Sequence, residues 1–142
     1  MIDHIAGLIF NEDGQLLVLR KKTIDNRKEC ILPGRKREEN ESDEQTLRRE
    51  LSEELGVEIQ ELKYYKQYLD KAIFEEGEDF QQTTYITKLN SNNIDVRNEI
   101  KEALWIDLDY EKKGILCNPI LKLKIIPDLK KDGFFKEKEM ER

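Results

Sequence analysis

The sequence is poor in the residues that build nucleophilic triads and soft-metal sites. Its 142 residues include one histidine, His4, and two cysteines, Cys30 and Cys117. The cysteines lack the C-x-x-C spacing of paired metal ligands, so neither a zinc site nor a histidine-based triad can be assembled from these three side chains. One disulfide is arithmetically possible, but the chain opens without a signal peptide, and two reduced core thiols are therefore expected.

The sequence also lacks a long apolar run and an excess of positive charge. No stretch approaches the roughly 20 apolar residues of a membrane-spanning helix. The formal net charge is -6 and the pI is near 5.0, which disfavours binding to the backbone of a long nucleic acid. We therefore expect a cytoplasmic protein with neither a membrane nor a nucleic-acid polymer as partner. A mononucleotide whose phosphates are carried by a divalent metal is compatible with this charge.

What is present is a grouped set of apolar residues under a charged surface. Hydrophobic residues make up 37% and charged residues 39% of the chain, and the grouping favours a small core over disorder. Two β-prone runs at 5–10 and 15–20 flank the turn formers of NEDG, which predicts an opening antiparallel hairpin. A short strand is expected in CILPG, one bent strand or two within 57–74, and further strands at 83–89 and 103–108.

Two helices complete the predicted architecture. The first is expected over 42–56, and the second begins at Asn118 and Pro119 and is ended or kinked by Pro127. The order of elements predicts an α/β (α+β) protein with helices packed on a mixed sheet. We expect one domain over residues 1–133 and a charged, frayed tail over residues 134–142, in which Phe134 and Phe135 could dock.

The first predicted helix gathers three carboxylates. Its boundaries are set by a capping box formed by Ser42 and Gln45 and by a terminal glycine, and leucines recur every four residues along one face. Glu50, Glu53 and Glu54 lie within roughly a 100° arc of the same helix. Packed carboxylates raise one another's pKa unless a cation compensates, and Mg²⁺ prefers such oxygen ligands while keeping room for phosphates. The alternative is a solvated acidic face paired with neighbouring arginines, the commoner outcome for an isolated E-x-x-E-E.

The surrounding segment decides between these interpretations. RKREENESDEQTLRRELSEELGV, residues 35–57, resembles the Nudix box G-x5-E-x7-R-E-U-x-E-E-x-G-U, in which U is a bulky aliphatic residue. Arg35 stands where the family has its first glycine. The other fixed positions match, namely Glu41, Arg49, Glu50, Leu51, Glu53, Glu54, Gly56 and Val57. The opening strands, CILPG and NEIKEALWIDLD are also similar to Nudix proteins. The resemblance implies the Nudix fold, with a mixed sheet sandwiched between helices.

The resemblance also implies a hydrolase of phosphoric anhydride bonds that uses Mg²⁺ or Mn²⁺. Glu50, Glu53 and Glu54 would bind the metal, with Glu50 and Glu53 also catalytic, and Arg49 would orient the carboxylates by charge-assisted hydrogen bonds. Glu41 would complete the acidic site near the metal or brace it. Further along the chain, Glu99 would assist the metal site, with Glu102 as its competitor and a surface acid as the alternative.

Three residues outside the helix are candidates for substrate binding. Arg20 matches a phosphate-contacting arginine of the family, or is a solvent-facing strand end. Arg35 could adopt its position with a negative φ, direct its guanidinium at a phosphate, or distort the loop. Asn118 is foremost a helix cap, and base recognition is its alternative.

Phe74, Phe80 and Tyr85 either line the cleft or pack in the core, and Trp105 is expected in the core.

The expected substrate is a small nucleotide. The size of the chain and Arg20 favour a canonical or oxidised (deoxy)nucleoside triphosphate, cleaved to a monophosphate and pyrophosphate. ADP-ribose, dinucleoside polyphosphates and nucleotide sugars stay open. Two other classes compete with the enzyme: a nucleotide-binding module that senses without cleaving, favoured by Arg35, and an acidic domain that binds a protein partner. The chain is expected to be a monomer or a homodimer.

Overall fold

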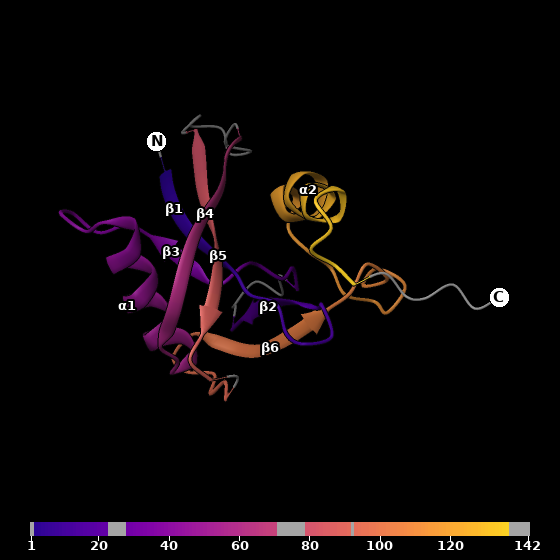
Figure 1. Cartoon of the computed structure of the whole chain (residues 1–142), viewed down its shortest axis with the longest axis horizontal. Helices are drawn as coiled ribbons and strands as arrows, with labels where there is room; N and C mark the ends of the chain where they lie inside the picture. The colour runs from indigo at the N-terminus through magenta and orange to yellow at the C-terminus, as the bar shows by residue number, and fades with distance from the viewer. Residues whose placement is uncertain (1, 23–27, 71–78, 92, 137–142) are drawn as a thin grey trace.

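The strands form two sheets in the computed structural model, which describes residues 2–22, 28–70, 79–91 and 93–136 (Figure 1). The elements are, in chain order, β1 (Ile2–Leu8), β2 (Leu16–Lys21), β3 (Gly34–Lys36), α1 (Asp43–Leu55), β4 (Ile59–Asp70), β5 (Phe80–Leu89), β6 (Ile100–Ile106), the π-helix η1 (Leu121–Ile125) and α2 (Ile126–Lys131). The larger sheet has the order β3-β1-β5-β4, and the smaller pairs β2 with β6. Because β1 and β5 are parallel and the other pairs antiparallel, the predicted mixed sheet is confirmed.

The predicted opening hairpin is wrong beyond its tip. Near the turn, Phe10 bridges Leu16 and the Leu17 N–H donates to the Ile9 carbonyl at 2.9 Å. Further from the turn, β1 and β2 diverge into different sheets. The apolar run of β2 explains the divergence, because its residues 16–19 are fully buried and contact the two cores alternately. A strand buried on both faces needs cover on each side, which an isolated hairpin does not provide.

Helix α1 forms as its sequence signals predict. The Ser42 Oγ accepts from the Gln45 N–H, and the Gln45 side chain accepts from the Ser42 N–H, so the capping box is complete. Gly56 ends the helix in the left-handed conformation with φ 63°. The leucine stripe, Leu47, Leu51 and Leu55, is fully buried. The carboxylates of the same helix are therefore held in a fixed orientation relative to the sheet.

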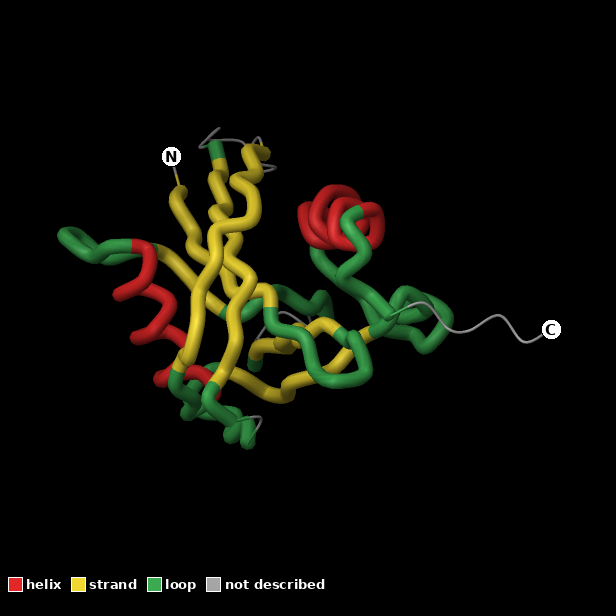
Figure 2. The backbone as a smooth tube through the Cα atoms, in the orientation of Figure 1, coloured by secondary structure: helices red, strands yellow, loops and turns green. Residues whose placement is uncertain are grey.

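The two helical layers cover opposite sides of the strands. The α1 leucines pack with Ile5 and Leu17 in one core, whereas Leu121 and Leu129 pack with Leu8 in the other. Figure 2 shows the same arrangement, with α1 and α2 separated by the strands. The expected sandwich of a sheet between helices is thus confirmed, with part of the strand layer in a second, two-stranded sheet.

The second helical segment begins as predicted but passes through its proline. The Asn118 Oδ1 accepts from the Leu121 N–H at 3.0 Å, which is the expected cap. Pro127 does not end the helix: it lies within the continuous helical run 119–131, in the first turn of α2, where the π-helix η1 gives way to α-helix. No helix in the described residues is long and apolar enough to cross a membrane.

The other expected strands differ from the prediction in their bounds. Of the region 57–74, residues 59–70 form one strand, β4, with register shifts after Ile59 and Tyr64, and residues 71–74 lie outside the described part of the chain. Within CILPG, Cys30 and Ile31 form isolated bridges, and Gly34 is the first residue of the regular strand β3. Cys30 and Cys117 are both free and buried, as expected of reduced core thiols. Phe135 is buried and its ring packs against Phe10, whereas residues 137–142 of the expected tail lie outside the described part of the chain.

Candidate active site

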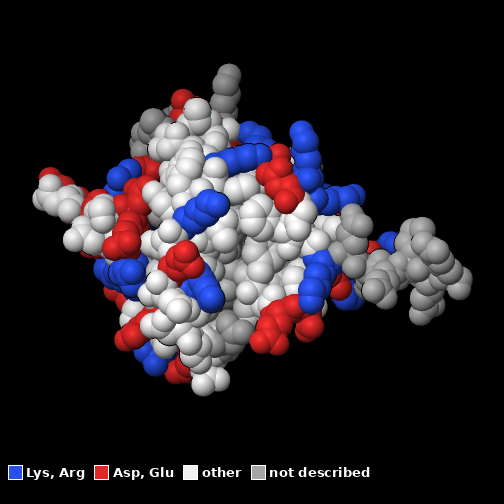
Figure 3. All heavy atoms as spheres, in the orientation of Figure 1, with Lys and Arg blue, Asp and Glu red and all other residues white. Residues whose placement is uncertain are grey.

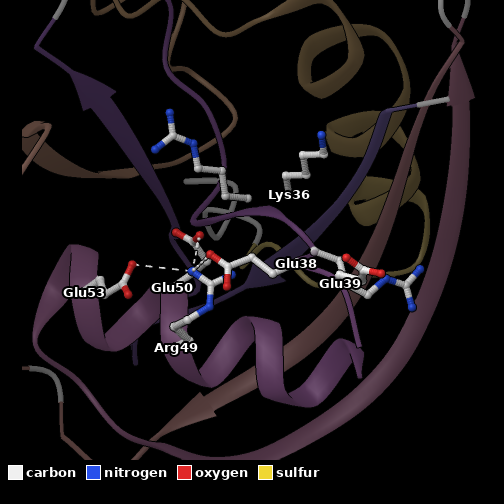
Figure 4. A pocket seen from close by; sticks show the side chains of 8 residues that line it. Lys36, Glu38, Glu39, Arg49, Glu50 and Glu53 are labelled. Carbon is white, nitrogen blue, oxygen red and sulfur yellow. Dashed lines mark hydrogen bonds and ion pairs between the residues drawn. The ribbon is translucent and has the colours of Figure 1, made fainter. Parts of the chain in front are cut away.

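The carboxylates of α1 face an open pocket between the helix and β3. The pocket has a volume of about 510 Å³. Three basic residues of β3 and the following loop, Arg35, Lys36 and Arg37, line it together with acids and one arginine, Glu38, Glu39, Arg49, Glu50 and Glu53. Figure 4 shows Arg49, Glu50 and Glu53 directed into the same space from the helix. Acidic and basic groups therefore meet in one hollow, as a site for a metal–phosphate ligand requires.

Arg49 holds three of the predicted site carboxylates together. Its guanidinium bonds both oxygens of Glu41, from Nε at 2.8 Å and from Nη2 at 2.9 Å. Its Nη1 donates to Glu50 at 2.8 Å and reaches Glu53 at 3.5 Å. The hydrogen bonds from Arg49, with the Glu38 N–H, lower the pKa of Glu41 to about 2. Because both Glu41 oxygens are engaged, Glu41 holds the arginine in place, and its role beside the metal stays a prediction.

Glu54 is a buried carboxylate of α1 whose hydrogen bonding is incomplete. Its side chain is buried, and its Oε1 accepts from the Gly34 N–H at 3.0 Å. Its Oε2 is buried and has no hydrogen-bond partner among the described residues. Burial raises the pKa of Glu54 to about 7, the Gly34 N–H acts in the opposite direction, and the charge of Glu50 raises it further. A buried, unsatisfied carboxylate oxygen is costly unless a ligand completes it.

The donors present suit a hard divalent cation. All of them are carboxylates, Glu50 and Glu54 are buried, and one Glu54 oxygen has no partner in the part of the chain that the structure describes. Within the described residues, no three acidic, histidine or cysteine side chains are already arranged to enclose a metal. This is compatible with Mg²⁺, which binds through one or two carboxylates and completes its shell with water and phosphate oxygens. The residues therefore fit the metal that the sequence implies.

Arg35 and Glu99 meet at the same site. Arg35 lies in β3 opposite Ile5 of β1, and its φ is not among the positive values found in the described chain. Its guanidinium forms an ion pair with Glu99, so the residue before β6 contacts a side chain that lines the pocket. Glu102, the competing candidate, instead pairs with Arg20. Its regular place in β3 meets the backbone condition expected for Arg35 in place of glycine, and its contact with a phosphate stays a prediction.

Arg20 does not point toward the carboxylate helix. It pairs with Glu102 and lies beside the Cys30 thiol, where its charge opposes the rise in the pKa of Cys30 caused by burial. Asn118 is close by along the backbone, because its N–H donates to the Cys30 carbonyl at 3.0 Å. Arg20 and Asn118 therefore both lie next to Cys30, on the opposite side of β2 from the carboxylates.

Lys21 is a charged residue near the site that sequence reasoning missed. Burial lowers the pKa of Lys21, Arg35 lowers it further, and the charges of Glu54 and Glu50 raise it, so its ammonium lies within electrostatic reach of both carboxylates. The alternation of β2 could have identified it: Leu17 and Leu19 face the α1 core, and period two continues that face to Lys21 rather than to Arg20.

The remaining candidates have structural partners. Phe80 packs edge-on against His4 at 4.8 Å between ring centroids, and the Tyr85 hydroxyl donates to Asp43 at the start of α1. Trp105 packs against the α1 core, as expected. Phe74 lies outside the described residues. On the face seen in Figure 3, acidic and basic side chains are interspersed, and no broad basic surface suited to a nucleic-acid polymer is visible.

The comparisons with known proteins agree with this geometry. Solved structures with the same fold include the E. coli ORF135 protein, which is 22% identical with a TM-score of 0.73, over 94% of this chain and 93% of that chain. A NUDIX hydrolase from Nitrosomonas europaea is 18% identical with a TM-score of 0.75, over 99% of this chain and 95% of that chain. A MutT protein from Methanosarcina mazei Go1 is 21% identical with a TM-score of 0.74, over 92% of this chain and 94% of that chain. No curated protein shows significant sequence similarity to the chain. The family model of the NUDIX domain matches residues 2–118. The chain therefore belongs to the Nudix family of hydrolases, which act on pyrophosphate bonds.

Proposed function

We propose that the chain is a Mg²⁺- or Mn²⁺-dependent pyrophosphohydrolase of a small nucleotide. The preferred substrate class is a canonical or oxidised (deoxy)nucleoside triphosphate, with a nucleoside monophosphate and pyrophosphate as products. The observation that carries the proposal is the buried Glu54 oxygen without a partner, beside carboxylates that Arg49 gathers at an open pocket. Neither a solvated acidic face nor a docking surface for a protein accounts for a buried, unsatisfied carboxylate.

Glu50, Glu53 and Glu54 would hold the metal. The metal would neutralise part of the phosphate charge and lower the pKa of a bound water. Arg49 orients Glu50 and Glu53, and Glu41 fixes Arg49 in place. Glu53 has a side chain that is 54% exposed, so it can also accept the proton released when water attacks phosphorus. An anhydride P–O bond breaks as the new P–O bond forms, and the departing phosphate takes the electron pair.

The basic residues around the carboxylates suit the phosphate chain. Lys21 lies near Glu50 and Glu54, and Arg35 lines the pocket. Arg20 and Asn118, which meet at Cys30, are proposed to contact the rest of the nucleotide. Since the Asn118 Oδ1 is used as the helix cap, only its amide NH₂ group is proposed to recognise a base.

Hydrolysis assays with Mg²⁺ against a panel of nucleotides test this proposal. The panel contains ordinary and oxidised deoxynucleoside triphosphates, ADP-ribose, diadenosine polyphosphates and nucleotide sugars. Glu53→Gln should lower the rate on the preferred substrate about a hundredfold or more. Glu44→Gln is the matched control, because Glu44 is an exposed acid of α1 that pairs with Arg48. Equal rates in the two variants would remove α1 from the proposed mechanism.

One observation favours a second function, a module that binds nucleotides without cleaving them. The ion pair between Arg35 and Glu99 engages a carboxylate that the active enzyme would use for metal. Such a module should show no turnover of any panel member, while Mg²⁺ with a nucleotide still raises the melting temperature. Metal-dependent turnover that is lost in Glu53→Gln decides for the enzyme.

A further inference from the structure

Arg35 occupies the one fixed position at which the chain departs from the Nudix motif. Its backbone is part of β3 and pairs with Ile5 of β1. Because its φ is not positive, this position does not need the conformational freedom of glycine. The side chain adds a guanidinium where the motif has none, and that guanidinium pairs with Glu99.

This ion pair lies beside the proposed metal ligands. Arg35 follows Gly34, whose N–H binds Glu54. Burial raises the pKa of Glu54, and the positive charge of Arg35 is among the influences that oppose it. The carbonyl of Glu99 accepts from the Lys22 N–H at 2.7 Å, which holds the Glu99 backbone next to the end of β2. The guanidinium is therefore close enough to compete with a cation for Glu99.

We propose that Arg35 is a built-in competitor of the metal for Glu99 and is released by the phosphate chain of the substrate. This inference rests on the proposed function. Without nucleotide, the guanidinium keeps Glu99 paired. When a phosphate chain enters, Arg35 turns to it and Glu99 becomes available to the metal. Metal and phosphate binding are then positively coupled through one side chain.

The exposure of the pair makes such an exchange inexpensive. Both side chains are 40% exposed, and ion pairs at this exposure are weak. A pyrophosphate group carries more negative charge than Glu99 and accepts two parallel hydrogen bonds from a guanidinium. The phosphate chain is therefore the stronger partner for Arg35, and the metal is the stronger partner for Glu99.

Mn²⁺ binding to the protein without nucleotide, measured by isothermal titration calorimetry, tests the competition. Arg35→Gly and Arg35→Gln should each bind Mn²⁺ about threefold to tenfold more tightly than the wild type. Lys36→Gln removes a positive charge from the same pocket without touching Glu99, and should change the affinity less than about twofold. In a Glu99→Gln background, Arg35→Gly should have no further effect, because the partner of Arg35 is already gone.

A second titration tests the release by phosphate. At saturating Mn²⁺, both Arg35 variants should bind imidodiphosphate about tenfold more weakly than the wild type, since a charge-assisted contact is lost. Unchanged Mn²⁺ affinity in both variants, or a gain that persists in the Glu99→Gln background, would overturn the inference. If the wild type nevertheless hydrolyses a nucleotide in a Glu53-dependent manner, only this inference falls. A wild type that neither binds Mn²⁺ nor turns over any nucleotide would remove the proposed function as well.

Discussion

Replacing Gly34 by alanine should destabilise the protein more than a glycine substitution elsewhere in the chain. Gly34 has φ +119°, and a Cβ built on it would lie 2.0 Å from the Ile5 carbonyl oxygen and 2.9 Å from the Ala6 Cα. Both atoms belong to the backbone of β1, which cannot move aside by changing a rotamer. Strands β1 and β3 would therefore have to separate at the Ala6–Gly34 pair.

The size of the effect follows from two contributions. A side chain held in this region of φ costs on the order of 1–3 kcal/mol, and the backbone clash adds to it, so we expect a loss of about 3 kcal/mol or more in the free energy of unfolding. For a chain of 142 residues, the entropy of unfolding is about 0.3 kcal/mol per kelvin, so this loss lowers Tm by about 10 °C.

Urea denaturation and thermal melting of Gly34→Ala measure this loss, and Gly133→Ala is the matched control. Gly133 has φ +79°, but a Cβ there meets no atom of the described residues within 4 Å. The control should therefore lose only the conformational contribution, about 1 kcal/mol or about 3 °C. If Gly34→Ala lost no more stability than Gly133→Ala, the close approach of β3 to β1 would not be a constraint, and the reasoning would be refuted.

Three further predictions concern charged groups. Burial raises the folded pKa of Glu54 to about 7 from its ordinary value of 4.5, so the metal-free protein should lose stability as pH rises through this range. Glu54→Gln should then be more stable than the wild type by up to about 3 kcal/mol at pH 8, measured by urea denaturation with chelator, and no gain at pH 8 would contradict this. Arg49→Lys keeps the positive charge but cannot form the two parallel hydrogen bonds of a guanidinium to Glu41. Its kcat should fall about tenfold or more while its melting temperature changes little, and a wild-type kcat would show that the paired hydrogen bonds are not needed. Burial and, to a lesser extent, the charge of Lys21 lower the folded pKa of His4 from 6.5 to about 4. The stability that neutral His4 contributes is therefore lost as pH falls from 6.5 to 4, and His4→Gln should make the free energy of unfolding depend less on pH in this range, as measured by denaturation at several pH values.

The parts of the site that depend on local spacing could be predicted from the amino-acid sequence. Helix α1 begins at Ser42 and ends at Gly56, as its caps predict, because capping bonds form between residues close in sequence. Helical periodicity likewise places Glu50, Glu53 and Arg49 on one side of α1 with the leucines buried beneath.

Contacts between residues of different elements could not be predicted, because they depend on how the strands and helices pack. The departure of β2 from β1 depends on burial against two cores, which no local turn signal encodes. Arg35 and Glu99 are 64 positions apart, and their pairing requires β3 and the start of β6 to be placed by the sheets. The unpaired Glu54 oxygen arises in the same way, because its burial and its contact with Gly34 exist only after α1 has packed on the strands.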